Sequence, residues 1–239
     1  MESHHPHHVT HKKKWTEYLL EFFMLFFAVF LGFVAENIRE HSVEKERARQ
    51  YIHSFYNDLL NDTAEYSFLI SEYDSKVQGL AARKECYHAL RQTNSNECLL
   101  NLINLSRGFT DLITSDQTLQ QLKNSGNFRL LPQADTDSIL LYDKMVRTFV
   151  KRETTGFQEN IYNLRNTISS LLNYEWKIKE NGDTKANVLI PGTEELLNRF
   201  FNLLDDNAWR REGFLKALIL LKQKATGLIK YFKNKYHLE

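Results

Sequence analysis

The sequence is poor in the residues that break helices and in those that form cross-links. Its 239 residues include only 9 glycines, 3 prolines and 2 cysteines. Tight hairpins and phosphate-binding loops depend on glycine, so its scarcity favours helices. Two cysteines are too few for a disulfide-rich scaffold or a cysteine-based zinc site. The formal net charge is only +1. Because nucleic-acid-binding proteins usually carry an excess of basic residues, we expect no nucleic-acid partner.

The sequence also lacks the short motifs of common enzyme classes. It has no GxSxG, P-loop, HExxH or GxGxxG pattern. His41, His53 and His88 occur singly on predicted helix faces, where a surface or packing role is commoner than that of a catalytic base. We therefore predict a non-enzymatic protein without a cofactor. An enzyme with an unrecognised site is the alternative.

One hydrophobic run predicts a transmembrane helix over residues 15–36. From Leu19 to Ala35 only Glu21 is charged, and these 17 residues cover roughly 26 Å as a helix. The hydrocarbon core of a bilayer is about 30 Å thick. Trp15 and Tyr18 suit the interface, and lysines 12–14 can reach lipid headgroups. The run passes into the charged segment AENIREHSVEKERARQ, so an uncleaved span is favoured over a cleaved signal peptide.

Glu21 lies about one turn inside this run, and two interpretations are open. Its carboxyl group can reach back to the interface or stay protonated. Alternatively, it is a proton or cation site within an oligomer of spans, because ionisable groups inside membranes are commonly functional. Gly32 has no second glycine four residues away, so no GxxxG dimerisation motif is present.

A histidine-rich tail precedes the span. His4, His5, His7, His8 and His11 can bind Zn²⁺, Ni²⁺ or Cu²⁺ through their imidazole groups. No cysteine or carboxylate completes a tetrahedral set of ligands. We therefore expect residues 1–14 to be disordered, with weak adventitious affinity for metals and no resident metal ion.

The remainder of the chain predicts helices. Apolar residues recur every three or four positions from Ile52 to Leu80, which indicates a long, stalk-like amphipathic helix over residues 37–92. Residues 93–239 then form a helical bundle completed by this helix. The expected fold is all-α: a transmembrane helix that continues into a long helix, followed by an antiparallel helical bundle. The apolar stripe either pairs with a second copy as a coiled coil or is covered by the chain's own later helices.

Two local features are candidate sites. Cys86 and Cys98 flank a predicted turn at residues 93–96, so they can form a disulfide between two antiparallel helices or remain separately buried thiols. Farther along, Gly126 is placed to end a helix over residues 116–125 with positive φ, and Arg129 to cap that helix's last carbonyl groups. This corner is either purely architectural or a surface for a partner.

Two segments resemble a known family. KKKWTEYLLEFFMLFFAVFLGFVAENIREH is similar to the N-terminal span of uncharacterised single-pass membrane proteins common in Bacteroidota, which carry a histidine-rich tail and an EYLLEF…AENIRE segment. Residues 118–145 resemble their L-x-x-S-G-x-x-R-L motif, and the matching residues are Leu119, Leu122, Ser125, Gly126, Arg129, Leu130 and Tyr142. The resemblance implies a helical fold and a bacterial inner-membrane location, but no reaction.

These features together predict a membrane-anchored envelope scaffold, sensor or assembly module. The triple lysine favours a cytoplasmic N-terminus and a periplasmic bundle, although Arg39, Lys45, Arg47 and Arg49 follow the span. The expected partners are the lipid bilayer, a further copy through the span and stalk helix, and an unidentified protein. The alternative function is an oligomeric ion- or proton-conducting, or motor-associated, membrane subunit that uses Glu21.

Overall fold

The computed structural model describes residues 14–93, 96–173 and 188–238, except for the side chains of residues 93 and 152–155. Throughout these ranges the secondary structure is helical, and no strand occurs apart from an isolated bridge between Leu172 and Leu189. The predicted all-helical class is therefore confirmed. The chain divides into two compact units, Met1–Gln50 and Tyr51–Glu239, and each is described by itself.

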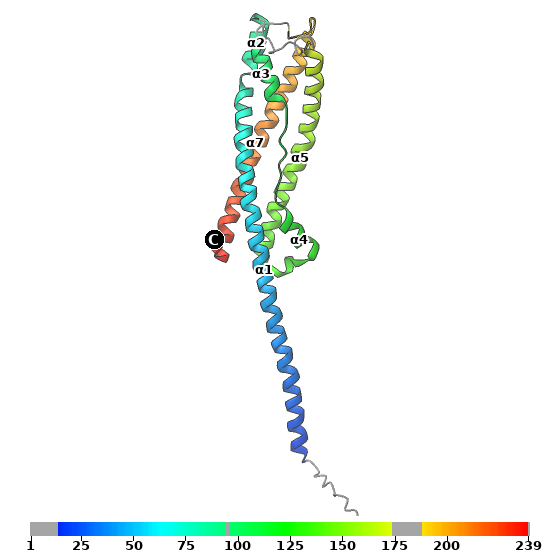
Figure 1. Ribbon diagram of the computed structural model, residues 1–239, viewed down its shortest axis with the longest axis vertical. Helices are drawn as coiled ribbons and strands as arrows, with labels where there is room; N and C mark the ends of the chain where they lie inside the picture. Colours follow the sequence, from blue (N-terminus) through cyan, green and yellow to red (C-terminus); the bar gives the residue numbers. More distant parts are fainter. Residues whose placement is uncertain (1–13, 94–95, 174–187, 239) are drawn as a thin grey trace, which may run out of the picture. The chain divides into compact units, whose positions relative to one another are not determined.

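The first unit contains the N-terminal part of helix α1 (Trp15–Ala81), shown in blue in Figure 1. Of the helices in the described ranges, this one is long and apolar enough to cross a membrane. Its most apolar segment has a mean hydropathy of 2.3, and none of that segment is buried. The helix begins at Trp15, where the predicted transmembrane segment begins.

The second unit contains the rest of α1 and several further helices. They are α2 (Arg83–Thr93), α3 (Glu97–Ser106), α4 (Gln117–Ser125), the 3₁₀ helix η1 (Asn127–Leu130), α5 (Gln133–Leu171) and α7 (Glu194–Tyr236). Within this unit, α1, α5 and α7 are long helices that lie side by side, as their side-chain contacts show, and α2 and α3 lie at one end (Figure 1).

The apolar stripe of α1 faces the core of the second unit. Its residues point inward every three or four positions, as the sequence period requires. Because the chain's own helices cover this stripe, it offers no surface for a coiled coil with a second copy. The apolar residues that α1 buries are Ile52, Phe55, Tyr56, Leu59, Tyr66, Leu69, Tyr73 and Leu80.

The helix predicted over residues 37–92 is interrupted at a single residue, Ala82. α1 ends at Ala81 and α2 begins at Arg83. The Arg83 side chain donates a hydrogen bond to the carbonyl oxygen of Leu80 at 3.1 Å and forms an ion pair with Asp205 of α7. A side chain that binds carbonyl groups within the helical hydrogen-bond ladder is a recognised cause of helix kinks, and no proline or glycine occurs at position 82.

Polar contacts join α5 to α7 near both ends of their shared length. Near the start of α5, Asp135 accepts a hydrogen bond from Tyr231 of α7 at 2.7 Å. Farther along α5, the Asn160 side chain donates to the carbonyl oxygen of Leu203 at 3.1 Å and to Asp206 at 2.8 Å. Aromatic rings fill the core between these contacts; Phe214 of α7, for example, lies 5.0 Å from Phe149 of α5.

Candidate functional site

The N-terminal part of α1 exposes a continuous apolar surface. Its phenylalanines stack along the helix, with ring centroids 6.3 Å apart for Phe22 and Phe26 and 6.0 Å apart for Phe26 and Phe30. Trp15 is 79% exposed and Phe33 is 78% exposed. Soluble monomers rarely expose apolar patches larger than a few hundred Å². This surface therefore requires lipid or another protein to cover it.

Glu21 lies on this helix and is exposed. An α-helix turns by about 100° per residue, so Glu21 shares a face with Ala28 and Gly32, whereas Phe22 and Phe26 lie on another face. The helix thus presents one aromatic face and one face that combines small residues with a carboxyl group. Ala28 and Gly32 have the four-residue spacing of small residues that lets membrane helices approach closely.

The histidines predicted as weak metal ligands lie outside the described residues. These are His4, His5, His7, His8 and His11. Of the predicted tail, only residue 14 lies within the described residues. Within residues 14–93, 96–173 and 188–238, no group of three or more histidine, cysteine, aspartate or glutamate residues is arranged to hold a metal ion.

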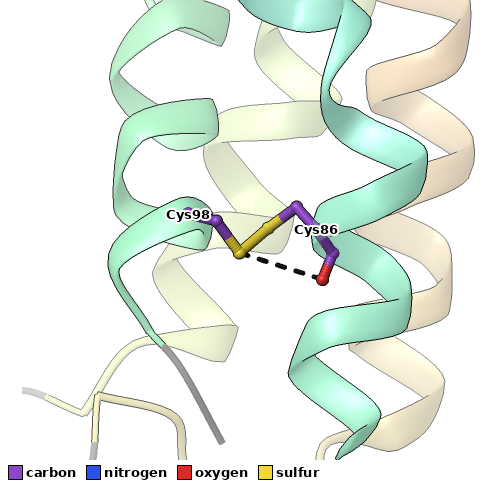
Figure 2. Close-up of a disulfide and its surroundings, with 2 residues drawn as sticks. All are labelled: Cys86 and Cys98. Atoms are coloured by element: carbon purple, nitrogen blue, oxygen red, sulfur yellow. Dashed lines mark hydrogen bonds between the residues drawn. A yellow bond between two sulfur atoms is a disulfide. The ribbon is translucent and has the colours of Figure 1, made fainter. Parts of the chain in front are cut away.

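Cys86 of α2 and Cys98 of α3 form a disulfide (Figure 2). Their Cα atoms lie 5.6 Å apart, and the Sγ atom of Cys98 lies 3.8 Å from the carbonyl oxygen of Cys86. Cys86 is 3% exposed and packs in the core cluster with Leu90 and Leu99. The sequence left open whether these residues pair; in the structure the bond joins the two short helices at one end of the second unit.

The corner after α4 has the backbone conformation expected from its glycine. Gly126 has φ +66°, and it ends the helix at Ser125. Arg129 lies in η1 and is exposed. The side chain of Asn127 donates a hydrogen bond to the hydroxyl group of Tyr51 on α1 at 2.8 Å, which attaches the corner to that helix. The proposed capping by Arg129 stays a prediction.

Residues 107–116 form an extended connector between α3 and α4, and side chains of α1 hold its backbone. The Tyr73 hydroxyl group donates to the Thr110 carbonyl oxygen at 3.2 Å and accepts from the Thr110 N–H at 3.3 Å. The Thr110 hydroxyl group donates to Glu72 at 2.8 Å. The Ser115 N–H donates to Asp62 at 2.7 Å. These bonds satisfy backbone groups that a segment without secondary structure leaves open.

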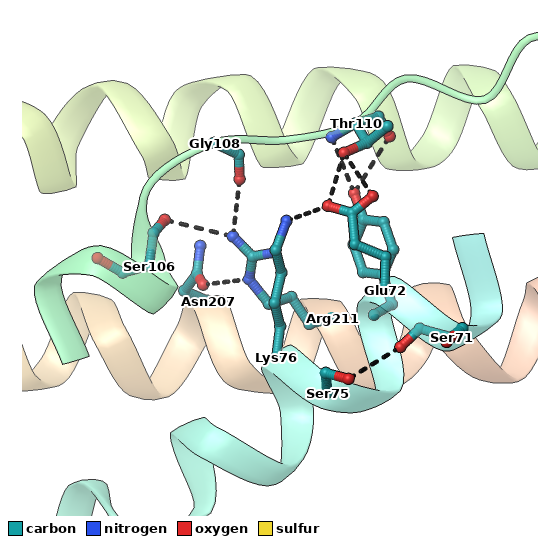
Figure 3. A network of polar contacts seen from close by, with 10 residues as sticks. Ser71, Glu72, Ser75, Lys76, Ser106, Gly108, Thr110, Asn207 and Arg211 are labelled. Carbon is teal, nitrogen blue, oxygen red and sulfur yellow. Dashed lines mark hydrogen bonds and ion pairs between the residues drawn. The ribbon is translucent and has the colours of Figure 1, made fainter. Parts of the chain in front are cut away.

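Arg211 of α7 is fully buried beside this connector (Figure 3). Its Nη2 atom donates to the carbonyl oxygens of Gly108 at 2.8 Å and Ser106 at 3.3 Å, and its Nε atom donates to Asn207 at 2.8 Å. A cation at these carbonyl groups complements the C-terminal end of α3. Arg211 therefore fixes one end of α3, as the disulfide fixes the other.

Burial lowers the pKa of Arg211 from its ordinary value, and the nearby Tyr73 and Glu72 oppose this effect. The guanidinium group lies 5.7 Å from the ring centroids of both Tyr73 and Phe157, which is within the range of cation–π attraction. Its Nη1 atom has no hydrogen-bond partner among the described residues. The aromatic faces thus provide part of the environment that a carboxylate usually provides for a buried arginine.

Asp62 of α1 lies in a second buried polar cluster. It accepts a hydrogen bond from the Tyr142 hydroxyl group at 2.8 Å, and the oxygen of Tyr142 lies 2.7 Å from that of Tyr66. Burial raises the pKa of Asp62, although the bonds from Ser115 and Tyr142 oppose the rise. Burial is also the main cause of the raised pKa values of both tyrosines. This cluster fastens α1 to α5 and to the connector.

Asp135 of α5 is the centre of a third cluster, at the C-terminal end of α7. Its carboxylate accepts hydrogen bonds from Tyr231 at 2.7 Å, from Lys235 at 2.6 Å and from Tyr236. Burial opposes ionisation, but the bonds from Lys235, Tyr236 and Tyr231 outweigh it and lower the pKa of Asp135. Burial and the bond to Asp135 raise the pKa of Tyr236 to about 12.

Sequence patterns identified none of Arg211, Asp62 and Asp135 as the centre of a buried polar cluster. Asp62 and Arg211 had one detectable signal, since each occupies a core position in an apolar helical period: Asp62 lies between Leu59 and Tyr66, and Arg211 between Ala208 and Phe214. Their partners are distant in the chain and cannot be read from local spacing.

A cleft of about 300 Å³ lies between α2 and α7. Arg83 and Asp205 form an ion pair at 2.7 Å in its lining, and the rings of Tyr87 and Phe201 lie 5.1 Å apart. His88 also lines the cleft. The Arg83–Asp205 ion pair and the hydrogen bond from the Tyr87 hydroxyl group to Asn198 at 3.4 Å hold α2 against α7.

Comparison with known proteins finds no match: no protein-family model, no curated protein and no solved structure is similar to this chain.

Proposed function

We propose that this chain is a single-pass, non-enzymatic membrane protein that holds an antiparallel helical bundle at the bacterial inner membrane as an envelope scaffold, sensor or assembly module. The N-terminus lies in the cytoplasm and residues 51–239 lie in the periplasm. The resemblance to Bacteroidota membrane proteins suggests the source and the location, and an unidentified protein is the expected partner.

The observation that carries this proposal is that the most apolar segment of α1 is also exposed. The apolar segment near Trp15 has a mean hydropathy of 2.3 and is not buried at all. In a soluble protein such a helix would be a core helix, covered on all sides. Lipid covers it without any further protein.

The disulfide supports the periplasmic placement of the second unit. Disulfides persist in oxidising compartments such as the periplasm and are rare in the cytosol. Cys86 is 3% exposed, and α2 and α3 pack around the bond. Because the cytoplasm would keep these two cysteines reduced, the disulfide favours a periplasmic location for this unit.

Thiol labelling in intact cells tests the orientation. Gln223 is exposed on α7, so a Q223C variant offers a thiol on the second unit, and S3C offers one on the other side of the span. With a membrane-impermeant maleimide, Q223C should label in intact cells and S3C only after lysis. Cys98 should label only after reduction. Labelling of S3C but not Q223C would show that the second unit is cytoplasmic and would refute this placement.

A second candidate function is an oligomeric proton- or ion-conducting, or motor-associated, subunit. It is favoured by the position of Glu21 on the same helix face as Ala28 and Gly32, where spans can approach closely. An E21Q variant should abolish proton flux and function if the carboxyl group is used. An E21Q variant with normal function and normal membrane insertion would reject this candidate.

A further inference from the structure

A groove of about 370 Å³ lies between α5 and α7 and has a mainly apolar lining. Its apolar wall comprises Leu141, Met145 and Phe149 of α5 and Ala217, Leu220 and Leu221 of α7. Leu141 is 59% exposed and Leu220 is 47% exposed, so the described residues leave this face open. Ligand pockets typically have such volumes, with apolar walls and a few polar groups. The polar groups here are Thr148 and Lys144.

Two exposed lysines lie at this groove. Lys144 belongs to its lining, and Lys224 is three residues beyond Leu221 and seven beyond Ala217, on the same face of α7. The hydrogen bonds of Asp135 to Tyr231 and Lys235 show which residues of α5 and α7 lie opposite each other. Counted nine residues from that contact, Lys144 is level with residues 222–226 of α7, and counted from the closer contact between Phe149 and Phe214 it is level with residue 219. Lys224 therefore lies within about one turn of the level of Lys144.

The charge on the α7 side of this groove is one-sided, whereas on α5 the exposed Asp137, which accepts a hydrogen bond from Gln133, lies one turn before Leu141. From Gly213 to Tyr236, α7 contains six lysines and no aspartate or glutamate. Among the described residues, neither Lys144 nor Lys224 has a carboxylate partner. Two ammonium groups within about one turn of each other beside an apolar groove favour a ligand with an anionic head on an apolar chain.

We propose that the α5–α7 groove binds a single-chain anionic amphiphile of the fatty-acid type. The alkyl chain lies on Leu141, Phe149 and Leu220, where its burial removes apolar surface from water on both molecules. The carboxylate lies between the ammonium groups of Lys144 and Lys224. This site goes beyond the proposed anchoring function and does not depend on the orientation of the span.

The size and charge of the groove disfavour other occupants. A stable protein interface uses roughly 20 to 30 residues on each side, whereas eight residues line this groove. A second copy would bring its own lysines against Lys144 and Lys224, and like charges repel. A small anionic ligand suits both the small number of lining residues and the positive charge of the two lysines.

Photolabelling of the full-length protein in phosphatidylcholine nanodiscs tests the proposal. The probe is dodecanoate with a diazirine on its alkyl chain, and mass spectrometry locates the labelled peptides. We expect labelling within residues 141–149 and 217–221, displaced by unlabelled dodecanoate but not by dodecyltrimethylammonium. Labelling at other positions, or equal displacement by the cation, would overturn the proposal.

Two variants separate the roles of charge and shape. The double variant K144E/K224E changes exposed side chains, so it should keep the fold while reducing dodecanoate affinity by more than about tenfold, because two charge-assisted contacts are lost. A217W should fill the groove and abolish labelling; circular dichroism and melting temperature check its fold. Unchanged affinity in K144E/K224E would overturn the proposal even if A217W failed to fold. Displacement of the probe by phosphatidylglycerol in the disc would identify a bilayer lipid as the occupant, which would also overturn it.

Discussion

Two parts of helix α1 use hydrophobic residues in different ways. In the first part, side chains such as Phe27 are exposed on every face of the helix, and in the part from Ile52 onward apolar residues form one stripe that is almost completely buried. The first pattern suits lipid as the solvent, and the second suits a protein core. The distribution of apolar residues around a helix can therefore suit one part of it to lipid and another part to a protein core.

Truncation of a core residue in the second part should have the largest effect. Leu59 is fully buried, whereas its neighbour Leu60 is 41% exposed. We expect L59A to lower the free energy of unfolding by about 2 to 5 kcal/mol through lost contacts and a cavity. L60A is the matched control and should change it by less than about 1 kcal/mol. Thermal unfolding of both variants in nanodiscs measures the difference, and equal effects would mean that the stripe is not the core.

A charge in the first part should weaken membrane insertion. Phe27 lies at the centre of the apolar run and is 52% exposed, and Phe68 in the second part is 61% exposed. F27R should disfavour insertion by about 3 kcal/mol, the cost of an arginine at the centre of a membrane helix. F68R faces water and should insert normally. Carbonate extraction of membranes measures insertion, and equal membrane fractions for F27R and F68R would contradict the lipid-facing assignment.

Loss of the disulfide should destabilise the second unit, residues 51–239, and leave the membrane segment unaffected. The double variant C86S/C98S removes a link across a short loop, and chain-entropy arguments give a loss of about 2 to 3 kcal/mol. Membrane insertion should be unchanged. The wild-type protein under reducing conditions should show the same decrease in melting temperature as the variant. A wild-type melting temperature that is insensitive to reduction would mean that the bond contributes nothing to the fold.

The acid stability of the second unit should depend on Asp135. Its pKa is lowered in the folded state, so its contribution is present above the ordinary value of 3.8 and is lost as pH falls through the folded value. D135N weakens the bonds from Tyr231, Lys235 and Tyr236 and should lower stability at neutral pH by about 2 kcal/mol. Because the titrating group is absent, D135N should lose less of its stability than wild type when both are acidified. An identical pH profile would reject this assignment.

Asp62 should show the opposite dependence on pH with a smaller effect. Its folded-state pKa is raised, so its contribution is complete below the ordinary value of 3.8 and is lost as pH rises through the folded value. D62N keeps an acceptor for Ser115 and removes the buried charge, and it should change stability at neutral pH by less than about 1 kcal/mol. D62A is the control, because it leaves the Ser115 N–H and the Tyr142 hydroxyl group without this acceptor and should be clearly less stable than D62N. Equal stability of the two variants would refute the role of this carboxyl group.

Local sequence patterns determined much of the architecture. The scarcity of glycine and proline and the period of apolar residues predicted the helical class, the apolar helix from Trp15 and the buried stripe of α1. Gly126 likewise predicted the end of α4, because positive φ is a property of the residue itself. These features follow from neighbouring residues along the chain, and so they can be read without the fold.

The tertiary structure decided how polar residues find their partners. Asp135 binds Lys235, Arg211 binds the carbonyl group of Gly108, and Asp62 binds Tyr142, across separations of 80 to 103 residues. The interruption at Ala82 also lies beside such a contact, since the Arg83 side chain pairs with Asp205 of α7. Helical periodicity places each of these side chains on a face of its helix, but only the packing of helices brings two such faces together. The α5–α7 groove has the same origin, because its walls come from two helices that are remote in the sequence.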